Sequence, residues 1–197
     1  MSILILNESF NEPKISKKEI LRYLGCNNED AKVNELLDLC LKEALHKLKY
    51  KVSYCELSVS VDGDICDFDV FSVRSNALSD RLKGCKKVIL FAATVGIELD
   101  RLIAKYIKIS PSKAVIFQAI GAERIEALCN QFCYDLSEKN KLKLMPRFSP
   151  GYSDLSVTVQ KDIFSILNCN KNLGLYLTDG LLMSPTKSVT AFVGIVD

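Results

Sequence analysis

The feature of the sequence that most constrains the fold is one long helical segment in the second half of the chain. Ser110-Pro111 supplies an N-cap residue followed by proline at the first helical position, and a helical pattern can then continue to about Glu138. A helix of this length is long for a globular protein. Ala119, Gly121 and Ala122 form a patch of small residues near its middle, where another element can pack closely.

The first half of the chain combines helices with strands. Ser16 and Glu19 have the spacing of a capping box and predict a short helix. Spacings of three and four residues predict a second helix through Val33, Leu36, Leu37, Cys40, Leu41, Ala44, Leu45 and Leu48. From Tyr50 the apolar period becomes two and slips in phase near Glu56, which predicts a strand with a bulge. Asp62-Gly63 then indicates a hairpin.

The order of the remaining helices and strands indicates the fold class. A continuous apolar run from Val88 predicts a buried strand, and a helix opens at Gly96. Shorter helices are expected near residues 76–83 and 156–167, and apolar segments at 173–179 and 188–196 close the chain. The elements do not alternate as regular βαβ units. We therefore predict one domain over residues 1–197, with an α+β fold of mainly antiparallel sheet packed with long helices.

The charge balance argues against partners that bind through overall charge. The formal net charge is +2, which gives no field that singles out nucleic acid or anionic membrane. No apolar run reaches the roughly 18 residues of a membrane span, and the segment MSILILNESF lacks the basic start of a signal peptide. We expect a cytoplasmic protein that binds neither nucleic acid nor membrane.

Catalytic and metal motifs are scarce. The chain has eight cysteines but no CxxC, and one histidine, so the usual zinc sites are hard to assemble. Cys129 and Cys133, one helical turn apart, suit either a metal or redox role or plain apolar packing. Four acidic residues suit either a cation cluster or a turn with polar strand positions: Asp62, Asp64, Asp67 and Asp69. We predict no metal site and no catalytic side chain.

The stretch RFSPGY, residues 147–152, is the best candidate for a binding loop. Arg147 can grip a carboxylate with two hydrogen bonds, and Tyr152 offers an aromatic face with a hydroxyl. Pro150 stiffens the loop, and Gly151 lets a backbone approach a ligand closely. These residue types also suit a tight turn with a salt bridge, so they leave both interpretations open.

A longer series of residues resembles a known family. In the activation domain of cobalamin-dependent methionine synthase, the motif R-x-x-P-G-Y is followed by a helix and then by a strand with L-T-[ED]. The motif M-x-P and a serine-valine strand come next, and this chain has the same order. The matching residues here are Arg147, Pro150, Gly151, Tyr152, Leu177, Thr178, Asp179, Met183, Pro185, Ser188 and Val189. The resemblance covers residues 86–197, and residues 1–85 look like the N-terminal part of a stand-alone form. The sequence departs from the family after the tyrosine, where SDLS replaces a Cys-Pro segment.

The resemblance implies a ligand and a set of contacts. The family domain binds S-adenosylmethionine, whose methyl group, with one electron, restores methylcobalamin from inactive cob(II)alamin. By this resemblance Arg147 holds the methionyl carboxylate, the backbone around Pro150 and Gly151 contacts the ligand, and Tyr152 packs beside it. An acidic residue of the long helix also contacts the ligand, and Glu126 matches best, with Glu123 as the alternative one turn away.

The implied function is that of a reactivation subunit without catalytic side chains, an accessory to a methyltransferase. Its partners are a cobalamin-binding, methyl-transferring methionine synthase subunit, which carries the cobalamin, and a flavodoxin-type protein as candidate reductant. The main alternative is an assembly module that binds the corrinoid protein but not S-adenosylmethionine. An independent methyltransferase with another acceptor is a third alternative, for which the sequence offers no candidate base.

Overall fold

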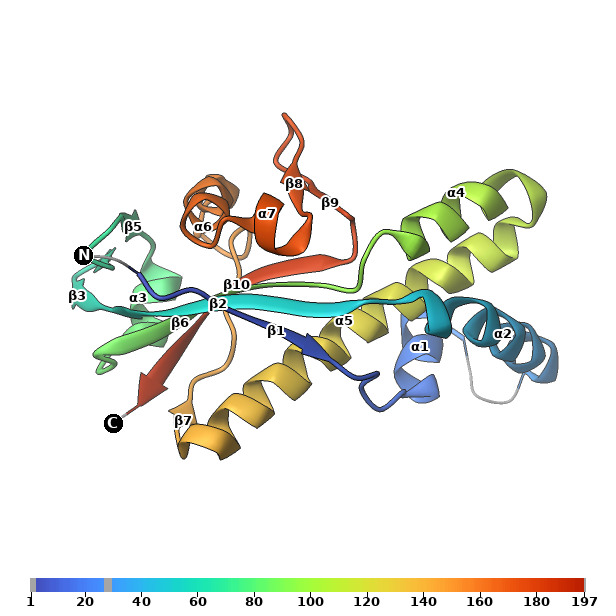
Figure 1. Ribbon diagram of the computed structural model, residues 1–197, viewed down its shortest axis with the longest axis horizontal. Helices are drawn as coiled ribbons and strands as arrows, with labels where there is room; N and C mark the ends of the chain where they lie inside the picture. Colours follow the sequence, from blue (N-terminus) through green and yellow to red (C-terminus); the bar gives the residue numbers. More distant parts are fainter. Residues whose placement is uncertain (1–2, 27–29, 197) are drawn as a thin grey trace.

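The computed structural model describes residues 3–26 and 30–196 and is built around a five-stranded antiparallel sheet. In order across the sheet, the strands are β1 (Leu6–Phe10), β2 (Tyr50–Ser58), β6 (Lys87–Thr94), β10 (Ser188–Val196) and β7 (Lys143–Leu144). Strands distant in the sequence thus lie side by side at the centre (Figure 1). The predicted α+β class with a mainly antiparallel sheet is confirmed.

The longer helices pack on one another and enclose a core together with one face of the sheet. These are α1 (Lys17–Leu24), α2 (Ala31–Ala44, continued by a 3₁₀ turn at Leu45–Lys47), α4 (Glu98–Ile109) and α5 (Pro111–Asn140). The predicted long helix is therefore confirmed, with Pro111 in its first turn and 30 residues in all. At about 1.5 Å per residue, α5 is long enough to run diagonally past the sheet, from beside α4 to β7 (Figure 1). Phe91, Phe117 and Phe132 are fully buried or nearly so in the core that these helices enclose.

The opposite face is covered by smaller elements. They are α3 (Asn76–Leu82), α6 (Gln160–Ile166, preceded by a 3₁₀ turn at Val157–Val159), α7 (Cys169–Leu173) and a small sheet of β3 (Ser60–Asp62), β4 (Ile65–Asp67) and β5 (Ser72–Arg74). A second core lies under them, in which Phe68 stacks on Phe192 with ring centres 5.2 Å apart. Short strands β8 (Tyr176–Leu177) and β9 (Met183–Ser184) pair as a hairpin that projects beside α7 (Figure 1).

The bulge predicted near Glu56 is wrong, and the two cores explain why. Strand β2 pairs with β6 without interruption, and Glu56 lies directly opposite Ile89. Tyr54 belongs to the first core, whereas Cys55 and Leu57 belong to the second. The apolar phase slips because burial moves from one face of the strand to the other, not because the backbone gains a residue.

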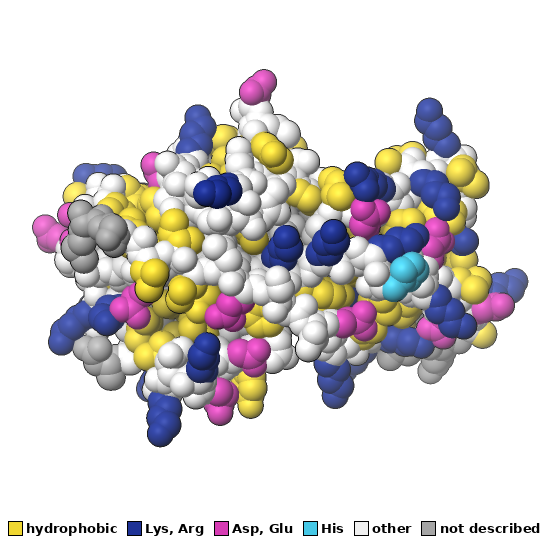
Figure 2. Space-filling view, viewed as in Figure 1, with side chains coloured by type: hydrophobic (Ala, Val, Ile, Leu, Met, Phe, Trp, Pro, Cys, Tyr) yellow, Lys and Arg dark blue, Asp and Glu magenta, His cyan; other side chains and the backbone are white. Residues whose placement is uncertain are grey.

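The surface adds two observations. Among residues 3–26 and 30–196, no helix combines the length and the apolar character needed to cross a membrane. Figure 2 shows that Lys and Arg side chains on the viewed face lie interspersed with Asp and Glu. The described residues of that face therefore form no broad region of a single charge.

Candidate functional site

The candidate site lies at the end of strand β10 that is paired with β6 on one side only. The segment that contains β7 runs along β10 as far as Phe148, which exchanges two backbone hydrogen bonds of 2.9 Å with Phe192. Beyond Phe148 the chain turns away, and residues 188–190 of β10 border a cavity of about 450 Å³. This volume lies within the range of small-molecule pockets. The wall consists of Arg81, Glu126, Arg147, Phe148, Ser149, Pro150, Tyr152, Gln160, Met183, Ser188, Val189 and Thr190.

Both layers of helices contribute to this wall. Glu126 comes from α5, which packs on the first core, and Gln160 comes from α6, which packs on the second. The cavity therefore lies at the edge of the sheet, between the two layers.

Arg147 forms the charged part of the site together with helix α5. Its Nη2 donates to Glu126 Oε2 at 2.7 Å, and its Nη1 donates to Asn130 Oδ1 at 2.7 Å. The Arg147 side chain is 22% exposed and that of Glu126 is 45% exposed. A positive and a negative group thus stand next to each other at the cavity, each partly open to a ligand.

Cys129 and Cys133 lie on α5 close to the same arginine. The charge of Arg147 acts to lower the pKa of both thiols, but burial is the larger effect and raises each pKa above its ordinary value. A raised pKa keeps a thiol protonated at neutral pH, whereas metal binding and redox chemistry use the thiolate. The environment therefore favours the packing interpretation of this pair. Within the described part of the chain, no three or more His, Cys, Asp or Glu side chains gather as metal ligands would.

The structure brings three of the four predicted loop residues to the cavity. Pro150 lies buried in the wall, and Tyr152 lines the cavity with 68% of its surface exposed. Gly151 is not among the lining residues, and its N–H donates to the Leu155 carbonyl at 2.8 Å. Its φ of +93° lies in the left-handed region that favours glycine, so Gly151 shapes the turn.

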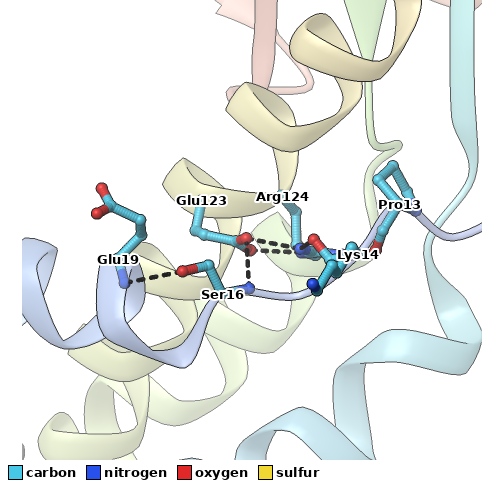
Figure 3. Close-up of polar contacts among 6 residues, drawn as sticks. All are labelled: Pro13, Lys14, Ser16, Glu19, Glu123 and Arg124. Atoms are coloured by element: carbon cyan, nitrogen blue, oxygen red, sulfur yellow. Dashed lines mark hydrogen bonds and ion pairs between the residues drawn. The ribbon is translucent and has the colours of Figure 1, made fainter.

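Glu123, the alternative acidic residue, lies elsewhere. It forms a buried ion pair with Arg124 and accepts a hydrogen bond from the Ser16 N–H at 3.0 Å (Figure 3). Of the two acidic residues considered on this helix, Glu126 is the one located beside Arg147.

Several wall residues were not expected from the sequence. The Arg81 guanidinium lies over the Phe148 ring, 5.4 Å from its centre. Gln160 and Thr190 are almost wholly buried polar residues. None of them belongs to a motif with a known chemistry, and only the meeting of α3, α6 and β10 assembles them.

Asp154, in the segment SDLS, connects the loop to α3. Its carboxylate accepts from Ser75 Oγ at 2.6 Å and from the Asn76 N–H at 2.7 Å. These bonds cap the helix that carries Arg81, so Asp154 holds two parts of the cavity wall together.

We expect Asp154→Ala to lower the melting temperature by an amount that depends on pH. The hydrogen bond from Ser75 is the main cause that lowers the pKa of Asp154 below its usual 3.8. The stabilisation is therefore complete above the unfolded pKa and is lost as the pH falls through the folded pKa. Thermal scans from pH 7 to pH 2 should show wild type and variant converging at the acid end. A difference that stays constant down to pH 2 would contradict this account.

Comparison with solved structures identifies the fold, whereas the sequence comparisons found no match. No protein-family model matches the sequence, and no curated protein matches it. Among solved structures, the crystal structure of the MetH reactivation domain bound to AdoHcy matches with a TM-score of 0.70 and 14% sequence identity. The match covers 98% of this chain and 78% of that one. The chain therefore has the α+β fold of the MetH reactivation domain.

Proposed function

We propose that the chain binds S-adenosylmethionine in the cavity beside Arg147 and supports the reactivation of cobalamin held by a methionine synthase partner. The observation that carries the proposal is the Arg147–Glu126 pair at a ligand-sized cavity. The fold adds support, because a protein with the same fold was crystallised with AdoHcy.

The charges suit the amino-acid end of this ligand. A methionyl group carries a carboxylate and an ammonium, which need a donor fork and an anionic acceptor. Arg147 supplies the fork and Glu126 the acceptor, and both are partly exposed. Tyr152 presents an exposed aromatic face at the same cavity, which suits stacking on a flat ring.

The role needs no acid, base or nucleophile from this chain. S-adenosylmethionine, when bound, supplies an activated methyl group. The residues of the chain hold and orient the ligand at a partly open cavity that a cobalamin-carrying partner can approach. A flavodoxin-type protein in the cytoplasm would supply the electron.

Calorimetric titration of the purified chain tests the proposal. We expect S-adenosylmethionine and AdoHcy to bind with one site per chain. At a free concentration of about 100 times Kd, ligand should stabilise the fold by about 2.7 kcal/mol, which a thermal scan detects. Absence of heat and of thermal stabilisation, with and without the corrinoid protein, would refute ligand binding. Association with the corrinoid protein in that case would identify the chain as an assembly module.

A further inference from the structure

Two buried oxygens in the cavity wall have no hydrogen-bond partner among the described residues. They are Oε1 of Gln160, on α6, and Oγ1 of Thr190, on β10. The two residues are 7% and 1% exposed, respectively. A buried polar atom without a partner destabilises a protein, and such atoms are few in folded chains. Their occurrence together at one cavity suggests that a ligand completes their hydrogen bonding.

The two oxygens lie on the other side of the sheet edge from the charged pair. Side chains alternate along a strand, so Thr190 points to the same face as Phe192, which belongs to the second core. Helix α6 packs on that core too, whereas Glu126 comes from α5 on the first core. The cavity therefore has a charged side, at Arg147 and Glu126, and a side with neutral hydrogen-bonding groups.

We propose that Gln160 and Thr190 recognise the uncharged nucleoside part of the ligand while Arg147 and Glu126 hold its amino-acid part. This inference rests on the proposed function. An amide and a hydroxyl match neutral donors and acceptors, such as ribose hydroxyls and the adenine edge. Both side chains can turn about their terminal torsions toward a ligand, and a hydroxyl can donate or accept as required.

The first test measures the chain without ligand. Thr190→Val replaces the hydroxyl by a methyl group of similar shape and removes a buried polar atom that lacks a partner. We expect a melting temperature equal to or above that of wild type. A clear fall would show that the hydroxyl is satisfied inside the protein and would overturn the inference.

The second test compares two probes by calorimetry: S-adenosylmethionine and 5′-methylthioadenosine, which retains the nucleoside but lacks the amino-acid end. We expect Thr190→Val and Gln160→Met each to weaken the binding of both probes by about 3- to 10-fold, the effect of one neutral hydrogen bond. Arg147→Ala should weaken the binding of S-adenosylmethionine far more than that of 5′-methylthioadenosine.

Ser53 offers a matched control. Its hydroxyl is also buried and has no hydrogen-bond partner in the described part of the chain. Ser53 lies in register with Ala92, which lies opposite Thr190. It therefore shares a sheet face with Thr190 but does not line the cavity. Ser53→Ala should leave the binding of both probes unchanged. If the wild type binds the probes and Thr190→Val and Gln160→Met bind them as tightly, this inference would be overturned, but the proposed function would not. A wild-type chain that binds neither probe would overturn the proposed function and the ligand assigned here with it.

Discussion

Replacing Arg124 by methionine is expected to lower the free energy of unfolding by about 3–5 kcal/mol. Arg124 is fully buried and donates to Glu123 at 2.5 and 2.6 Å. It also donates to the carbonyls of Pro13 at 2.7 Å and Lys14 at 2.9 Å (Figure 3). The variant leaves the Glu123 carboxylate buried without its counter-ion and removes the donors for both carbonyls. The segment before α1 would thereby lose its main polar attachment to α5.

Urea unfolding measures this effect, and two further variants control it. Arg101→Ala breaks an exposed pair with Glu98 and should cost about 1 kcal/mol or less. The double variant Arg124→Met/Glu123→Gln removes both charges and should be more stable than Arg124→Met alone, because no uncompensated charge stays buried. A loss of less than about 1 kcal/mol in Arg124→Met would mean that the network contributes little to stability.

The same network shows how far local sequence patterns predict structure. The Ser16–Glu19 spacing predicts the start of α1, and Ser16 Oγ does accept from the Glu19 N–H at 3.3 Å. In a full capping box the Glu19 side chain would return to the Ser16 N–H. Here Glu123 takes that position, from 107 residues further along the chain. A local motif predicts the helix start, but the partner that completes it comes from tertiary packing.

The candidate site likewise contains residues that the sequence predicts and residues that only the tertiary structure reveals. The sequence pattern places Arg147, Pro150 and Tyr152 on one loop, and the resemblance to the family pairs that loop with Glu126. The structure brings all four to one cavity. Gln160 and Thr190 could not be predicted in this way, because they stand out only as buried side chains whose oxygens have no hydrogen-bond partner among residues 3–26 and 30–196. That property exists only once α6 and β10 lie together, and it leaves no pattern in the residue types.

Arg147→Ala is expected to weaken the binding of S-adenosylmethionine by about 2–4 kcal/mol, or about 30- to 700-fold. The substitution removes the donor fork for the carboxylate and leaves Glu126 facing the ligand's negative end. Arg147→Lys should restore only part of the affinity, because an ammonium cannot make the two parallel hydrogen bonds of a guanidinium. The fold should persist, because Glu126 is 45% exposed and can be hydrated when its partner is lost.

Two other arginines provide comparison variants for Arg147→Ala. Arg74 is exposed on β5 and pairs with Asp64 at 2.8 Å, away from the cavity wall, so Arg74→Ala should bind ligand as wild type does. Arg81 lines the cavity and lies over the Phe148 ring, so it offers a second positive group. If Arg81→Ala abolished binding and Arg147→Ala did not, the carboxylate would belong to Arg81 and the assignment of Arg147 would be wrong. Loss in Arg147→Ala, with Arg74→Ala unchanged, would locate the carboxylate contact at the Arg147–Glu126 pair.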